Sequence, residues 1–200
     1  MKLGKAALEA LQAQVTGRLL PGDDIIVAGP IALSETVRLA QKEHTCLRTY
    51  FSRGFLYDAE NLLRDYGIDM PVEESQIWQE AQKAGAHALY AMKDGGFLSA
   101  LWIMAEASGT GLTADLRKVP IRQETIEICE RFDLDPYRLA SEGSLLIGIS
   151  SGEDLIQSLG RLGIEAVIIG RVNTSNDRLL YSGENARYLE RPRQKRQEGE

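Results

Sequence analysis

Residues 92–111, MKDGGFLSALWIMAEASGTG, decide the fold. The run that follows the paired glycines Gly95 and Gly96 is apolar on almost every side of a helix, up to Gly109. A helix of this kind must be buried on several sides. The stretch therefore predicts a central helix, with one strand before it over residues 86–92 and another after it over residues 112–116.

On the N-terminal side, apolar residues recur at helical spacing from Leu8 to Leu19, and Pro21 follows them. This spacing predicts an amphipathic helix. Residues 24–28 are short and rich in β-branched side chains, which predicts a strand. Ser34 is then expected to cap the next helix, because a serine side chain can accept hydrogen bonds from the first backbone N–H groups.

Between this region and the central helix, the pattern predicts two more helices. One covers residues 55–66 and ends at Gly67, and the other begins at Ser75 and ends at Gly85. Glycine just after the last turn is typical of helix C-termini. A further helix is expected after Pro120.

In the C-terminal third, predicted strands alternate with a predicted helix. Residues 145–149 and 166–172 are apolar runs typical of buried strands, and residues 155–162 between them have helical spacing. Residues 178–181 and 186–189 flank a turn and predict a hairpin. The whole pattern predicts an α/β fold, an α+β sandwich with a mixed sheet flanked by helices.

Composition excludes several classes of protein. With 200 residues, 44% hydrophobic and 26% charged, the chain is close to the average for soluble globular proteins. Its net charge of −6 argues against a general nucleic-acid binder. The apolar runs are too short to cross a bilayer, and the N-terminus lacks a secretory signal, so we expect a cytoplasmic protein. The basic run at 191–196 is interpreted as a solvated terminal segment.

The first candidate site is the turn formed by Lys93, Asp94, Gly95 and Gly96. A strand that leads through glycines into a helix leaves backbone N–H groups at the positive end of the helix dipole, where an anion can bind. Lys93 would add positive charge. Asp94 could instead cap the helix and occupy the same donors, so a capped turn remains the alternative.

The second candidate site comprises Glu142, Gly143 and Ser144, just before the strand at 145–149. A turn without a ligand is the alternative. His44 and His87 have no spacing typical of metal ligands, so no metal site is expected, and no catalytic residue can be assigned. Cys129 lies on the apolar face of its predicted helix and is interpreted as a small core residue.

The order of motifs along the chain resembles the C-terminal domain of the PurM-like superfamily, which includes AIR synthetase, thiamine-monophosphate kinase and the hydrogenase maturation factor HypE. The resemblance is strongest to HypE-like, AIR synthase-related proteins. The motifs that carry it are GGFLSAL (95–101), AEASGTG (105–111), VPIR (119–122), LDPY (134–137), ASEGSL (140–145) and IGRV (169–172).

This resemblance implies a PurM C-terminal-domain-like fold and a superfamily that binds ATP mainly through an N-terminal domain. It divides the chain into a helical arm (1–20), the AIR synthase-related domain (21–192) and a flexible tail (193–200). The family's Asp-x-Thr before the paired glycines is replaced here by Ala91 and Lys93, and the chain ends without the reactive cysteine of HypE.

These features lead to two functional hypotheses. The first is a protein that is non-catalytic by itself, with a weak site for ATP or another phosphate-containing ligand and a regulatory or assembly role. The second is a subunit that completes an ATP-dependent PurM/HypE-like enzyme with a separately encoded ATP-binding domain. Either protein is expected to form a homodimer or to bind a partner protein.

Overall fold

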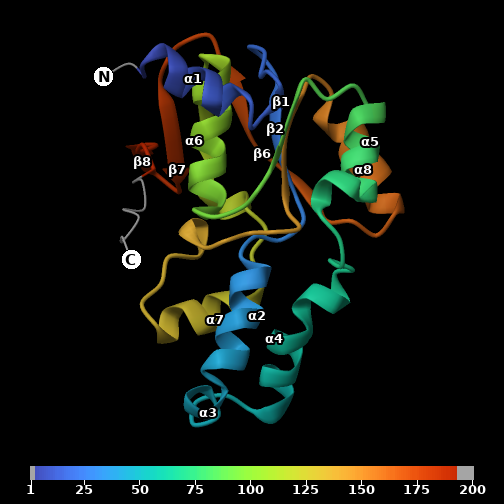
Figure 1. Ribbon diagram of the computed structural model, residues 1–200, viewed down its shortest axis with the longest axis vertical. Helices are drawn as coiled ribbons and strands as arrows, with labels where there is room; N and C mark the ends of the chain where they lie inside the picture. The colour runs from blue at the N-terminus through green and yellow to red at the C-terminus, as the bar shows by residue number, and fades with distance from the viewer. Residues whose placement is uncertain (1–2, 193–200) are drawn as a thin grey trace.

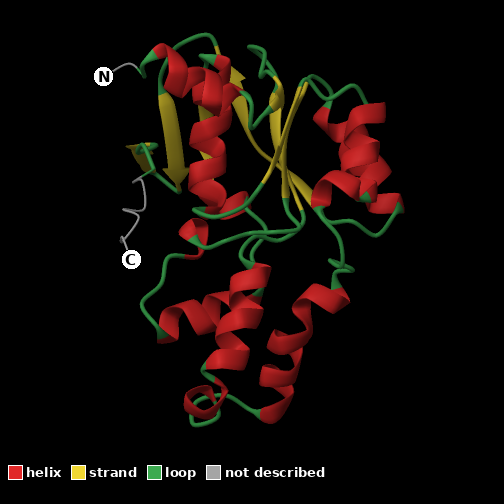
Figure 2. Cartoon of the chain, viewed as in Figure 1, coloured by secondary structure: helices red, strands yellow, loops and turns green. Residues whose placement is uncertain are grey.

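The computed structural model describes residues 3–192, which form one mixed sheet with helices on both faces and a helical cluster beyond one end (Figures 1 and 2). The strands are β1 (Thr16–Gly17), β2 (Asp24–Ala28), β3 (Ala88–Ala91), β4 (Gly111–Asp115), β5 (Leu145–Ile149), β6 (Ala166–Asn173), β7 (Arg178–Ser182) and β8 (Asn185–Tyr188). The α-helices are α1 (Lys5–Gln12), α2 (Leu33–Lys42), α3 (His44–Leu47), α4 (Arg53–Asp65), α5 (Gln76–Lys83), α6 (Gly96–Ser108), α7 (Gln123–Arg131) and α8 (Gly152–Arg161). Short 3-10 turns occur at η1 (Val72–Glu74), η2 (Leu116–Lys118) and η3 (Pro136–Arg138).

The eight strands lie in the order β1-β3-β5-β2-β6-β4-β7-β8. Neighbouring strands are antiparallel except for β4 and β7, which are parallel. Strand β2 is central, because its Ile26 pairs with Ile147 of β5 on one side and with Ile168 of β6 on the other. The predicted mixed sheet and the β7–β8 hairpin are confirmed.

Helices α6 and α1 cover one face of the sheet, and α5 and α8 cover the other (Figure 1). Helix α6 is the predicted central helix, and its buried residues include Phe97, Leu101 and Met104. Helix α1 packs on it, with the Gln12 side chain donating a hydrogen bond to the carbonyl of Ala107 at 3.1 Å. The burial of α6 on several sides follows from its nearly continuous apolar surface.

Helices α2, α3, α4 and α7 form a separate cluster at the lower end of the view in Figure 1. Its interior contains Leu39, Leu47, Leu56 and Ile128. The connections into and out of this cluster run along the end of the sheet where β2 ends and β5 begins. The packing of this cluster therefore positions the connecting segments against that end of the sheet.

The prediction of one N-terminal helix extending to Leu19 is wrong. Helix α1 ends at Gln12, and β1 follows it and pairs with β3. Gly17 has φ +79°, which is not a helical conformation. A Cβ atom there would lie 2.0 Å from the carbonyl oxygen of His87, because this segment lies directly against the backbone that leads into β3. Val15 and Leu19 are buried although they lie in this irregular segment and not on a helix. Their helical spacing therefore did not indicate a helix.

The expected cap at Ser34 is also wrong. Helix α2 starts at Leu33, its N-cap residue is Ala32, and the Ser34 hydroxyl donates to the carbonyl of Ala140 at 3.2 Å. The cap at Ser75 is confirmed, because its side chain accepts from the backbone N–H of Trp78. The domain boundaries at residues 20 and 192 stay predictions, and the tail at 193–200 lies outside the described residues. Within residues 3–192, no helix is long and apolar enough to cross a bilayer.

Candidate ligand-binding cleft

The glycine turn between β3 and α6 is tightly folded. Gly95 occupies the N-cap position with φ +84°, and Gly96 begins the helix with φ +65°. The backbone N–H of Gly96 donates to the carbonyl of Lys93 at 3.1 Å, so one donor of the helix start is already used within the turn. Asp94 lies one residue before the N-cap position. The turn therefore offers fewer donors than the sequence pattern predicted.

Backbone from a distant part of the chain covers this turn. A Cβ atom on Gly96 would lie 2.3 Å from the carbonyl oxygen of Leu139 and 2.8 Å from the carbonyl carbon of Arg138. Gly96 is buried. The second glycine is thus required both by its left-handed backbone conformation and by close packing.

The segment before β5 is held by two buried serines. The Ser144 hydroxyl donates to the carbonyl of Pro30 at 2.7 Å. The Ser141 hydroxyl accepts from the backbone N–H of Ala32 at 2.9 Å and donates to the carbonyl of Leu139 at 2.9 Å. These bonds fix the start of β5 to the loop before α2. Ser144, predicted as a ligand residue, has its hydroxyl engaged inside the protein.

Four of the seven predicted site residues line one open cleft of about 860 Å³: Lys93, Asp94, Glu142 and Gly143. Gly95, Gly96 and Ser144 lie outside its lining. The structure thus brings together two segments that are far apart in the sequence. Lys93 and Glu142, which belong to two separate candidate turns, line the same space, and their role in binding a ligand stays a prediction.

The opposite wall of the cleft was missed by sequence reasoning. It consists of the segment that joins α4 to α5, including Ile68, Met70 and the 3-10 turn Val72–Glu74. Lys93 forms an ion pair with Glu73 across the cleft, with its Nζ atom 3.3 Å from Oε1. Nothing in the spacing of this segment indicated which end of the sheet it would face.

The cleft carries more negative than positive charge. Its acidic lining residues are Glu73, Glu74, Asp94 and Glu142, and the only basic one among the described residues is Lys93. The Glu142 carboxylate accepts a hydrogen bond from the Ser34 hydroxyl. Within residues 3–192, no group of three or more His, Cys, Asp or Glu residues could hold a metal ion.

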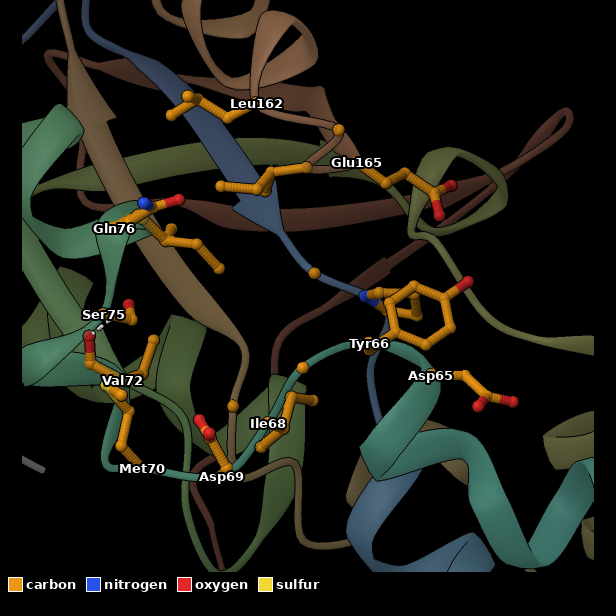
Figure 3. A pocket seen from close by; sticks show the side chains of 17 residues that line it. Asp65, Tyr66, Ile68, Asp69, Met70, Val72, Ser75, Gln76, Leu162 and Glu165 are labelled. Atoms are coloured by element: carbon orange, nitrogen blue, oxygen red, sulfur yellow. Dashed lines mark hydrogen bonds between the residues drawn. The ribbon is translucent and has the colours of Figure 1, made fainter.

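A second cavity of about 480 Å³ adjoins the cleft, and Figure 3 shows its lining. The two spaces share Ile68, Met70, Val72 and Gly143 as walls. Gly143 has φ +89°, and a Cβ atom there would lie 2.6–2.9 Å from three side-chain carbons of Ile68. Ile68 and Gly143 thus form a close-packed partition between the cleft and the cavity.

The histidines and Cys129 have structural partners. The His87 Nδ1 atom lies 2.8 Å from the Oδ1 atom of buried Asp23, and the His44 Nε2 atom lies 3.7 Å from the Oε1 atom of Glu60. Burial raises the pKa of the Cys129 thiol to about 12, so the reactive thiolate is scarce at neutral pH. The interpretation of Cys129 as a core residue is confirmed.

Two curated proteins are similar to this chain in sequence. Over 137 residues the chain is 36% identical to a carbamoyl dehydratase HypE of Rhodobacter capsulatus, covering 68% of this chain and 36% of that protein. Over 156 residues it is 39% identical to a putative hydrogenase expression/formation protein of Methanocaldococcus jannaschii, covering 74% and 42%. The chain thus spans about two fifths of the length of these curated relatives.

Among solved structures, E. coli HypE matches with a TM-score of 0.63 and 22% identity, over 87% of this chain and 51% of that one. Thiamine-monophosphate kinase from Stenotrophomonas maltophilia matches with a TM-score of 0.57 and 21% identity, over 84% and 52%. At this identity the two structures show a shared fold. The family model for the AIR synthase related protein, C-terminal domain, matches residues 20–181, and the chain therefore belongs to that family.

Proposed function

We propose that the cleft is a low-affinity site for ATP or another phosphate-containing ligand, in a domain that is regulatory or assists assembly and is not catalytic by itself. The observation that carries this proposal is the meeting of Lys93 and Asp94 with Glu142 and Gly143 around one open space. Lys93 is the group suited to a phosphate, because an ammonium donates charge-assisted hydrogen bonds to its oxygens.

The charges of the cleft support weak rather than tight binding. Lys93 is mostly exposed and already pairs with Glu73. Each further carboxylate around it repels a phosphate by about 1 kcal/mol at close range in water. A phosphate ligand would bind best together with its own counter-cation, or when a partner protein adds positive charge to the open side.

The openness of the cleft favours a second candidate function. The cleft is open to solvent, so a second protein could reach a ligand bound there. Under this alternative, the domain completes an ATP-dependent PurM/HypE-like enzyme with a separately encoded ATP-binding domain. One related structure is a HypE–HypF complex, which makes a partner in hydrogenase maturation a specific hypothesis for this chain. A homodimer stays a prediction beside it.

We expect Lys93→Ala to weaken the binding of ATP and Asp94→Asn to strengthen it, each by about 1 kcal/mol. The first change removes the only cation of the described cleft lining, and the second removes a carboxylate beside the helix N-terminus. Titration calorimetry with ATP and with inorganic phosphate measures both effects. The wild-type dissociation constant should lie between about micromolar and millimolar.

Lys42→Ala is the matched control, because Lys42 lies on α2 outside the cleft lining. It should leave the affinity for ATP unchanged. If Lys93→Ala has no effect, or if Asp94→Asn lowers the affinity, the turn is only the start of a helix and the proposed site is wrong.

We expect no ATP hydrolysis by the purified chain. The described cleft lining has a single lysine among four carboxylates, whereas phosphoryl transfer needs positive charge around the transferred phosphate. Phosphate release is measured with and without magnesium, against a buffer control. Magnesium-dependent release by the chain alone contradicts the proposal, whereas release that appears only with an added ATP-binding protein supports the second candidate.

A further inference from the structure

The cavity beyond the Ile68–Gly143 partition is separate from the proposed phosphate site. It lies where the segment that joins α4 to α5 faces the turn between α8 and β6. Its volume of about 480 Å³ is within the range of small-molecule pockets. None of the candidate residues from the sequence except Gly143 contributes to it.

The apolar side chains around the cavity include Ile68, Met70, Val72, Ile77, Leu162 and Ile164. Two of them leave large apolar side chains in contact with water, because Met70 is 48% exposed and Leu162 is 46% exposed. Figure 3 shows Leu162 on one side of the cavity and Met70 on the opposite side. A ligand with an apolar body would remove both side chains from water.

The charged groups around this apolar space are all acidic. Asp65, Asp69 and Glu165 line the cavity, and no lysine, arginine or histidine is among its described lining residues. Asp65 pairs with Arg64 at 3.1 Å. Across residues 3–192, the carboxylates of Asp69 and Glu165 form no ion pair or side-chain hydrogen bond. Figure 3 shows these two carboxylates on opposite sides of the cavity, Glu165 beside Tyr66 and Asp69 beside Met70.

Tyr66 adds an aromatic ring on the same side as Glu165 (Figure 3). Burial raises the pKa of its phenol, so the ring stays neutral over the physiological range. The guanidinium of Arg122 lies 5.8 Å from the ring centroid and is itself paired with Glu124 at 3.5 Å. The ring and Glu165 together suit a cation at this end, because aromatic faces and carboxylates both attract one.

We propose that this cavity binds a small organic amine whose apolar body contacts Ile68, Ile77 and Ile164 and whose ammonium group lies at the end formed by Glu165 and Tyr66. The apolar walls select the body, and the carboxylates select positive charge and repel an anion of the same shape. This proposal does not rest on the phosphate site, because the two ligands would lie on opposite sides of the partition.

The test uses three probes of one shape: phenethylammonium, the neutral 2-phenylethanol and the anionic 3-phenylpropionate. The protein carries labelled isoleucine methyl groups, which are followed by NMR during each titration. We expect phenethylammonium to shift the signals of Ile68, Ile77 and Ile164 and to leave that of Ile126, which is exposed on α7, in place. The alcohol should bind more weakly, and the carboxylate should bind least.

Two variants test the charges. Glu165→Gln should weaken phenethylammonium binding by about two- to fivefold, the range typical of partly solvated ion pairs, whereas Asp69→Asn on the opposite side of the cavity should weaken it less. Asp58→Asn, an exposed position on α4 outside the cavity lining, is the matched control and should change nothing. Spectra without ligand check that each variant is folded.

The proposal is overturned if the alcohol binds as tightly as the amine, if Ile126 shifts with the other signals, or if the Glu165→Gln variant binds like the control. Absence of any shift up to the solubility limit of the amine overturns it as well. Inorganic phosphate should leave the affinity for the amine unchanged, whether or not it binds in the neighbouring cleft.

Discussion

Replacement of Trp102 by alanine should lower the free energy of unfolding by about 3–5 kcal/mol, since it removes a large core aromatic. The side chain is only 8% exposed and belongs to the cluster between α6 and the sheet. The guanidinium groups of Arg178 and Arg191 lie 5.7 and 5.6 Å from its ring centroid. Their attraction to the ring is lost together with the apolar contacts.

Urea denaturation at equilibrium measures this loss. Tyr57→Ala is the control, because Tyr57 is an aromatic residue on α4 that is 57% exposed and should cost less than about 1 kcal/mol. A Trp102→Ala variant with an unchanged midpoint would show that α6 is not held in the core as described.

Replacement of Gly96 by alanine should cost about 2–5 kcal/mol. The left-handed conformation of the residue accounts for roughly 1–2 kcal/mol of this. The remainder, roughly 1–3 kcal/mol, comes from overpacking of the new methyl group against the backbone of Arg138 and Leu139. That backbone cannot rotate away as a side chain could.

Gly109 offers a control at the other end of the same helix. It has φ +68°, close to the φ +65° of Gly96, but a Cβ atom there would meet nothing within 4 Å. Gly109→Ala should therefore show only the conformational cost of roughly 1–2 kcal/mol. Equal losses for the two variants, measured by the same denaturation experiment, would contradict the close packing at Gly96.

Sequence reasoning predicted the elements whose local signals agree with their packing. Helix α6 is apolar on most sides because it is buried on several sides, and α5 begins directly after Ser75 because that side chain caps it. The prediction for the N-terminal segment was wrong because Val15 and Leu19 are buried although they lie in an irregular segment. Burial alone constrains which residues are apolar, and it does not require them to lie on one helix.

The lining of the cleft depends in part on contacts that the sequence does not indicate. The sequence indicates Lys93 and Glu142 as candidates from two separate turns, and their role in binding a ligand stays a prediction. The wall that contains Ile68, Met70 and Glu73 comes from a connection between two helices, and its position depends on how the helical cluster packs. Long-range packing of this kind leaves no periodic pattern in the sequence.

The central place of β2 in the sheet determines when the chain can fold. Residues 24–28 pair with residues 145–149 and 166–171, so both neighbours of the first long strand are synthesised more than a hundred residues later. Closing such long loops is entropically costly, and contacts of this separation slow folding. During synthesis, β2 has two unpaired edges and exposed apolar side chains until most of the chain has left the ribosome, and a chaperone that shields it would have its greatest effect in that interval.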